Sequence, residues 1–218
     1  AQGEIKRPEH LIAWWSRIFS FLCVPDDKDR IELRFLCRLF RDALKPPPLY
    51  TIFPHPNYST LNMLMDKLSD VFVENPNKAP QIVFVTEGTF HSKDEARRVY
   101  ITYPMKMIGA GQNKSILSNY RLIIQGMKEE GKTVELTNID LQGSGWDANG
   151  LYCDDGLSFL CDSMTITQCY NHGVEVYNTT GRLINCVITH CQGSGIYSHA
   201  GALVEVEGRK TKVEQNIT

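Results

Sequence analysis

The stretch that decides the fold is "GVEVYNTTGRLINCVITHCQGSGIYSHAG" (residues 173–201), because it contains nearly the same phrase twice. The phrase "GVEV" at residues 173–176 returns 22 residues later as "GIYS" at 195–198, and "GLYC" at 150–153 precedes it by 23 residues. Short apolar runs that recur every ~20–25 residues between Gly and Asn turns are typical of a solenoid. The spacing therefore predicts coils that stack on one another.

Stacked coils would place equivalent residues in columns. Each strand would lie about 4.8 Å from its equivalent in the previous coil, so that backbone groups pair between coils. Interior columns are predicted for Leu151, Val174 and Ile196, for Ile166 with Ile188, for Cys169 with Cys191, and at the apolar positions Leu160, Leu183 and Leu203. Turns are predicted at glycines and at Asn171, Asn178 and Asn185, because these residue types adopt left-handed backbone readily.

The same alternation gives a candidate binding surface. Tyr152, Glu175 and Tyr197 stand between inward residues of successive coils and are expected to face outward. Stacked tyrosines on an exposed sheet are a candidate partner-binding strip, because aromatic residues are enriched at interfaces. The alternative, scattered surface aromatics with no binding role, stays open.

The sequence ahead of the repeat divides into a helical and a strand-rich part. Residues 8–44 carry apolar residues at helical spacing in two segments, and "KPPPLY" ends the second. Residues 60–74 predict a further amphipathic helix. Strand-like runs follow at 81–88, 97–111, 115–118, 121–126 and 133–143. The expected organisation is a helical module at 1–50, a connecting segment at 51–79 and a mainly β solenoid at 80–218.

Composition narrows the function classes. The formal charge of −2 and the isoelectric point near 6.3 offer no basic surface for nucleic acid or anionic membrane, and no apolar run is long enough to span a bilayer. The N-terminal residues lack the pattern of a secretory signal. Seven cysteines in apolar contexts indicate reduced thiols. We expect an intracellular protein, cytoplasmic or nuclear.

Three sets of residues could form chemical sites, but for each of them a purely structural role is favoured. The acidic residues Asp147, Asp154, Asp155 and Asp162 are interpreted as solvated turns. A glycosidase-like pair drawn from Asp140, Asp147 and Asp162 is a weak signal, because the sequence does not give the distance between the carboxylates. A zinc set of Cys169, His172, His190 and Cys191 competes with an interior thiol column. The Gly109-x-Gly111 sequence is interpreted as a turn. We therefore predict no catalytic residue, no metal and no cofactor.

The strand-rich part resembles the pectin-lyase-like proteins, whose fold is a right-handed parallel β-helix. The resemblance covers residues 80–208, and "IVFVTEGTFHSKDEARRVYITYPMKMIGAG" (82–111) is similar to that family's opening phrase of strand, turn, strand and "IxGxG". It implies, as one function, a carbohydrate-active β-helix, either a lyase, a hydrolase or a binder.

The helical module resembles an F-box. "PEHLIAWWSRIFSFLCVPDDKDRIELRFLCRLFRDAL" (8–44) is similar to that family in its start at Pro8-Glu9, its "RIFSFL" phrase and its "FLCRLFRDAL" ending. The resemblance implies a substrate receptor of a cullin-type ubiquitin ligase, which docks on a Skp-type adaptor and binds an unknown protein substrate through the solenoid. The implied adaptor-binding residues are Ile18, Phe19, Leu22, Leu36, Cys37 and Phe40. A helical cap on the solenoid and a purely structural repeat scaffold are the alternatives.

Overall fold

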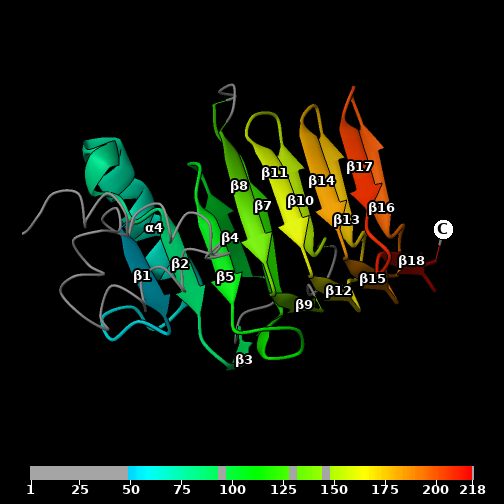
Figure 1. Cartoon of the computed structure of the whole chain (residues 1–218), viewed down its shortest axis with the longest axis horizontal. Helices are drawn as coiled ribbons and strands as arrows, with labels where there is room; N and C mark the ends of the chain where they lie inside the picture. Colours follow the sequence, from blue (N-terminus) through cyan, green and yellow to red (C-terminus); the bar gives the residue numbers. More distant parts are fainter. Residues whose placement is uncertain (1–48, 93–96, 128–131, 144–147, 218) are drawn as a thin grey trace, which may run out of the picture. The chain divides into compact units, whose positions relative to one another are not determined.

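A computed structural model of the 218-residue chain describes residues 49–92, 97–127, 132–143 and 148–217, which form a parallel β-solenoid. Its coils follow one another from β1 to β18, and each complete coil contributes one strand to each of three sheets (Figure 1). The five complete coils run from β2, β3 and β4 to β14, β15 and β16. The mainly β solenoid predicted from the repeat is confirmed, whereas the F-box-like residues 8–44 lie outside the described part of the chain.

The three sheets are named here by their number of strands. The seven-stranded sheet contains β1 (Tyr50–Phe53), β2 (Ile82–Val85), β5 (Lys106–Gly109), β8 (Thr133–Thr137), β11 (Ser158–Asp162), β14 (Thr180–Ile184) and β17 (Leu203–Glu207). The six-stranded sheet contains β3 (Gly88–His91), β6 (Ser115–Ser118), β9 (Asp140–Gln142), β12 (Thr165–Thr167), β15 (Val187–Thr189) and β18 (Lys212–Glu214). The five-stranded sheet contains β4 (Arg97–Ile101), β7 (Tyr120–Ile124), β10 (Leu151–Asp154), β13 (Val174–Tyr177) and β16 (Ile196–His199).

The predicted interior columns are present. Leu151 is in register with Val174, which is in register with Ile196, and Ile166 is in register with Ile188. Cys169 and Cys191 are both buried and their thiols interact. Burial of these apolar columns is the main source of stability for the coils.

Packing requires glycine at the first position of each repeated phrase. A β-carbon on Gly150 would lie 2.7 Å from Ile166 Cγ2 and 2.8 Å from Cys169 Sγ. At Gly173, one coil further on, it would lie 2.5 Å from Ile188 Cγ2. Side chains of the six-stranded sheet therefore occupy the space beside this column, and only glycine leaves room for them.

Left-handed turn residues form two further columns, at the turns that follow the seven-stranded and the six-stranded sheet. They are Asn138, Ser163, Asn185 and Gly208 in the first column, and Asn119, Gly143, Gln168, His190 and Gln215 in the second, all with positive φ. The prediction was correct for Asn178 and Asn185 but wrong for Asn171, which is not among the positive-φ residues. Ser163 and Gln168 were missed because their residue types seldom adopt this conformation, and His190 was missed although histidine adopts it more often than most non-glycine residues.

Two further expectations need correction. The run at 97–111 is two strands, β4 and β5, separated by a turn that contains Pro104. Leu160, Leu183 and Leu203 do not form a column, because Leu183 is in register with Cys161 and Leu203 with Thr180. For Leu160 and Leu183 the cause is one extra residue in the turn between β10 and β11 (155–157) compared with the turn between β13 and β14 (178–179). Leu203 begins its strand, whereas Leu183 lies near the end of its own.

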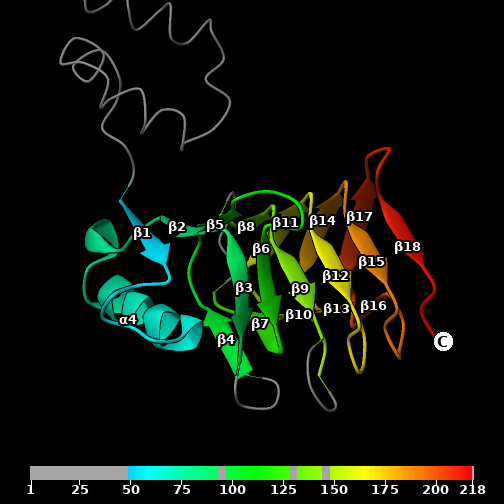
Figure 2. The ribbon, with the colours of Figure 1, turned by 90° about the horizontal axis from the view of Figure 1, so that it is seen from below.

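Helix α4 (Leu61–Glu74) packs beside β4 (Figure 2) and confirms the predicted amphipathic helix. Its apolar side, Leu61, Leu64, Met65 and Leu68, joins the core. The helix ends at Asn75, whose side chain accepts the backbone N–H of Asn77 and caps a short 3₁₀ helix, η1 (Pro76–Lys78). None of the helices in the described ranges has the length and apolar character to span a membrane.

Candidate functional site

The outer face of the five-stranded sheet brings the predicted strip together. Tyr152, Glu175 and Tyr197 are in register on β10, β13 and β16, so their side chains are vertical neighbours. A second outward row, Asp154, Tyr177 and His199, lies two residues further along the same strands. The face is therefore a continuous surface across at least three coils.

Glu175 is the centre of a polar network on this face. Its Oε2 accepts a hydrogen bond from Asn149 Nδ2, and Asn149 Oδ1 accepts the backbone N–H of His172 at 3.0 Å. The other carboxylate oxygen, Oε1, lies 3.2 Å from His199 Nε2, which is an ion-pair distance when the imidazole is protonated. Because Asn149 is buried, it holds the Glu175 carboxylate in one position.

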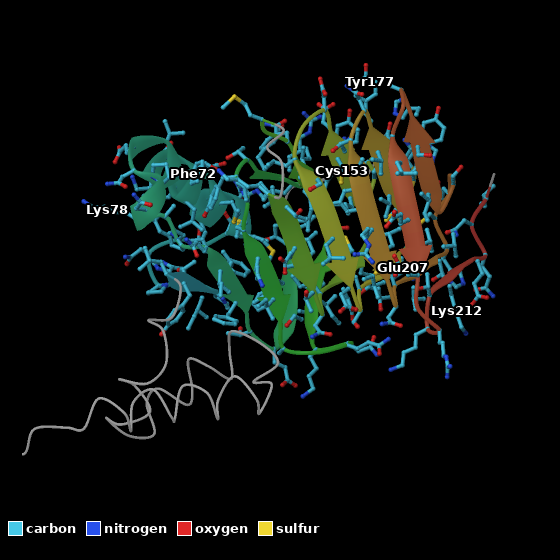
Figure 3. The ribbon with its side chains drawn as sticks, turned by 45° about the horizontal axis from the view of Figure 1, so that its top comes forward. Phe72, Lys78, Cys153, Tyr177, Glu207 and Lys212 are labelled. Carbon is cyan, nitrogen blue, oxygen red and sulfur yellow. The ribbon has the colours of Figure 1, made fainter. Side chains whose placement is uncertain are left out.

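An aromatic and imidazole cluster surrounds this network. The ring of His172 stacks on Tyr197 with centroids 4.6 Å apart, and His199 lies between Tyr197 and Tyr177, 5.0 Å from each. The backbone N–H of Ser194 donates to His172 Nδ1 at 3.0 Å, which places the proton of neutral His172 on Nε2. Tyr177 lies at the outer margin of the solenoid (Figure 3). Stacked rings with exposed faces can hold a planar or apolar group of a ligand.

Sequence reasoning did not place His172, Tyr177 or His199 in the strip, and it considered His172 only as a zinc ligand. Alternation could have found Tyr177 and His199, because each is two residues beyond an outward residue that was identified. His172 precedes its strand, but the period could have found it, because Asn149, His172 and Ser194 each stand directly before the glycine of a repeat.

The other end of the face carries two arginines. Arg98 on β4 is in register with Arg121 on β7, and the guanidinium carbon of Arg121 lies 4.9 Å from the centre of the Tyr152 ring. Burial lowers the pKa of Arg121, and the neighbouring positive charge of Arg98 lowers it further. Burial also raises the pKa of Tyr152, to which Asp154 and Glu175 add.

The acidic candidates do not converge. Asp154 faces outward on the five-stranded sheet, Asp155 accepts a hydrogen bond from Asn178 in a turn, and Asp162 lies on the seven-stranded sheet. Within the described ranges, no group of three or more His, Cys, Asp or Glu side chains could hold a metal ion. Asp147 lies outside those ranges.

The cysteines of the described coils are unpaired thiols in the core. Burial raises the pKa of Cys153, Cys161 and Cys186, which makes these thiols unreactive. Cys191 differs, because the neighbouring Cys169 thiol lowers its pKa. Cys169 and Cys191 thus fill an interior column, as predicted.

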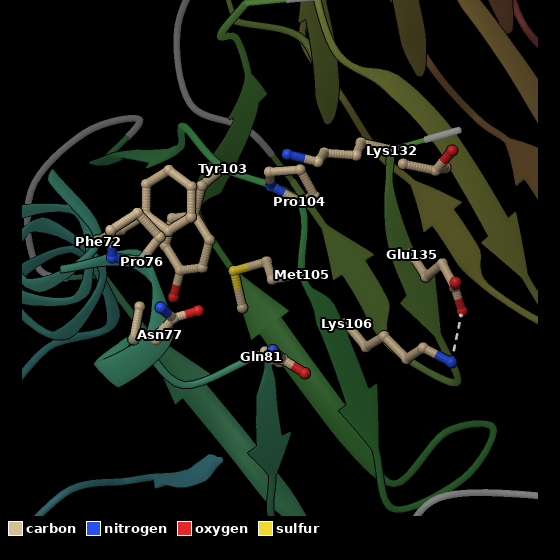
Figure 4. A pocket seen from close by; sticks show the side chains of 12 residues that line it. Phe72, Pro76, Asn77, Gln81, Tyr103, Pro104, Met105, Lys106, Lys132 and Glu135 are labelled. Atoms are coloured by element: carbon tan, nitrogen blue, oxygen red, sulfur yellow. Dashed lines mark ion pairs between the residues drawn. The ribbon is translucent and has the colours of Figure 1, made fainter. Parts of the chain in front are cut away.

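A cavity of about 460 Å³ lies away from this face, between η1, the turn before β5, and β8 (Figure 4). Phe72 and Tyr103 stack in its wall with centroids 4.5 Å apart, and Tyr103 donates a hydrogen bond to the carbonyl of Pro80. At the opposite side Lys106 pairs with Glu135 at 3.2 Å. Because Lys106 and Glu135 neutralise each other and the Tyr103 hydroxyl is already bonded, this cavity is a weaker candidate than the outer face of the five-stranded sheet.

Fold and face together define the class as a parallel β-solenoid with an aromatic and charged outer face. In comparisons with known proteins, no family model, no curated protein and no solved structure matches the chain.

Proposed function

We propose that the solenoid is a non-catalytic recognition module that binds a protein partner through the outer face of its five-stranded sheet. The observation that supports this most directly is the fixed column of Tyr152, Glu175 and Tyr197 with the His172 stack. Tyrosines and an arginine around a fixed carboxylate match the composition of binding hot spots. Tyr197 is 42% exposed and Tyr177 is 37% exposed, so both rings are accessible.

The resemblance of residues 8–44 to an F-box extends the proposal. The chain would then be the substrate-recognition subunit of a cullin-type ubiquitin ligase in the cytoplasm or nucleus, with a pectin-lyase-like, right-handed β-helix as its substrate-binding part. Ile18, Phe19, Leu22, Leu36, Cys37 and Phe40 would contact the Skp-type adaptor. The transfer chemistry would belong to other subunits of the complex.

The adaptor part is tested by binding the intact chain to a purified Skp-type adaptor in surface plasmon resonance. We expect saturable binding that Ile18→Asp and Leu22→Asp abolish, because a charge in an apolar contact is unfavourable. Tyr197→Ala is the matched control and should bind the adaptor as the wild type does. No binding by the folded wild-type chain would refute the ligase assignment.

The face is tested by crosslinking partners to the intact wild-type chain and to two variants. A protein captured by the wild type should be lost with Tyr197→Ala and retained with Leu203→Ala, because Leu203 is a similarly exposed apolar residue on the seven-stranded sheet. Equal loss with both variants, or with neither, would reject the five-stranded sheet as the binding face.

A carbohydrate-binding role is the second candidate, favoured by the exposed Tyr197 ring stacked on His172. A glycan array distinguishes it from the first. Oligosaccharide binding that Tyr197→Ala removes would favour the carbohydrate role, and release of unsaturated uronates would show lyase activity.

A further inference from the structure

Arg98 and Arg121 form a pair of like charges on the outer face of the five-stranded sheet. They are directly opposed on adjacent parallel strands, so their backbones are about 4.8 Å apart and their side chains lie on the same face of the sheet. Like charges in this position repel each other and destabilise the pair. In the part of the chain that the structure describes, neither guanidinium forms an ion pair with a carboxylate.

Arg121 is held in place from one side only. Its guanidinium packs over the ring of Tyr152, and the nearest acidic influence is Glu175, two strands away. Its Nε is buried and has no hydrogen-bond partner among the described residues. A buried N–H without a partner costs free energy, and this atom has no exposed surface, so any acceptor from outside must be met by the other N–H groups of the guanidinium or by a movement of the side chain.

Buried side-chain polar atoms without a hydrogen-bond partner are few in the described residues, and two of them lie on this face. Across the described residues, the buried polar atoms without a hydrogen-bond partner are Arg121 Nε, His199 Nε2 and Asp140 Oδ1. The first two lie on the outer face of the five-stranded sheet. His199 has the carboxylate of Glu175 beside it, whereas Arg121 packs on the Tyr152 ring and is opposed by a second arginine.

We propose that Arg98 and Arg121 bind a phosphate monoester group presented by the protein partner. A phosphate monoester carries about −1.5 to −2 charges at neutral pH, which matches two guanidinium groups, and its three terminal oxygens can accept from both at once. The phosphate oxygens would accept from guanidinium N–H groups of both arginines, and the dianion would offset the repulsion between the two positive charges. This inference rests on the proposed function and names the chemistry that the partner brings to the β4–β7 end of the face.

The test is a titration of the intact chain with phenyl phosphate by isothermal calorimetry at constant ionic strength. We expect saturable binding to the wild type and at least a tenfold weaker affinity for Arg98→Gln and Arg121→Gln. Arg121→Lys keeps the charge but removes Nε and the planar fork, so it should weaken binding nearly as much as Arg121→Gln. Arg182→Gln is the control, because it removes an arginine from the seven-stranded sheet, and it should bind phenyl phosphate as the wild type does. Circular dichroism checks that each variant is folded.

Two results would overturn the assignment. Equal binding of phenyl phosphate by all variants would show non-specific anion binding that does not depend on Arg98 or Arg121. Benzoate that binds as tightly as phenyl phosphate would show a site for carboxylates and not for phosphate. The titration needs no partner, so its failure is separable from failure of the proposed function. Partner capture that depends on Tyr197 in a chain that ignores phenyl phosphate would reject the phosphate site alone.

Discussion

The outer faces of the seven-stranded and five-stranded sheets are built on the same coils, but their outward side chains are used in opposite ways. On the seven-stranded sheet charges pair across strands, Lys106 with Glu135 and Arg182 with Glu205 and Glu207. On the five-stranded sheet Arg98 stands beside Arg121, and aromatic and imidazole rings stack around the Glu175 carboxylate. The charges of the seven-stranded sheet neutralise one another, whereas the two arginines of the five-stranded sheet can still bind a negatively charged ligand.

The largest expected effect concerns the core that both faces share. Leu151→Ala should lower the free energy of unfolding by about 2–5 kcal/mol, because it removes a fully buried side chain between Leu122 and Val174. Urea unfolding followed by circular dichroism measures this loss. Leu160→Ala, at a half-buried outward position of β11, is the control and should cost clearly less.

If the two faces form one cooperative unit, hydrogen exchange in Leu151→Ala should accelerate on both sheets. Exchange that accelerates only on the five-stranded sheet would show that the faces unfold separately, and would contradict a shared core.

The next effect concerns the polar network that only the five-stranded sheet has. Asn149→Ala should cost about 1–3 kcal/mol, because it leaves the His172 N–H and a Glu175 oxygen without their partner. Thermal unfolding measures the loss. Thr133→Ala removes a hydrogen bond to Ser158 on the seven-stranded sheet and should cost less, since that bond is only partly buried. A larger loss for Thr133→Ala would reverse the proposed contrast between the faces.

A pH dependence is expected from Asp140, which begins β9 on the six-stranded sheet. Its Oδ2 accepts the backbone N–H of Asn113 at 2.8 Å, and burial raises its pKa above the usual value. A raised folded-state pKa contributes stability that is complete below the unfolded-state pKa, about 3.9, and is lost as the pH rises through the folded-state pKa. Asp140→Asn should remove this decline.

The measurement is the free energy of unfolding of the wild type and Asp140→Asn from acid to neutral pH. The wild-type curve should fall relative to the variant as the pH rises. Curves that stay parallel would show that Asp140 titrates alike in the folded and unfolded states.

The columns and the candidate strip were accessible to sequence reasoning because they follow from repetition. Leu151, Val174 and Tyr197 recur at nearly constant spacing, and a parallel solenoid converts constant spacing into contact. Where a turn gains one residue, as at 155–157, the register shifts and Leu160 leaves the column predicted for it. Sequence spacing alone does not show in which turn the extra residue is accommodated.

The side-chain network was less accessible. Asn149 and His172 each precede the glycine that opens a repeat, so the period of 23 residues makes them vertical neighbours, but their hydrogen bond depends on side-chain geometry that spacing does not give. Sequence reasoning also did not identify the pair of Arg98 and Arg121, for a different reason. Arg98 and Arg121 belong to early coils whose sequences do not repeat the phrase at 173–176, so their register was visible only in the structure.

The smallest expected effect concerns the paired charges of the seven-stranded sheet. Lys106 and Glu135 are each more than a third exposed at the side chain, so their attraction is weakened by solvent. A double-mutant cycle with Lys106→Gln and Glu135→Gln should give a coupling below about 1 kcal/mol that shrinks as salt is added. A coupling well above that value, or one independent of salt, would mean that this face holds its charges as firmly as the Glu175 network. In that case the difference between the faces would lie in their aromatic residues and not in how their charges are satisfied.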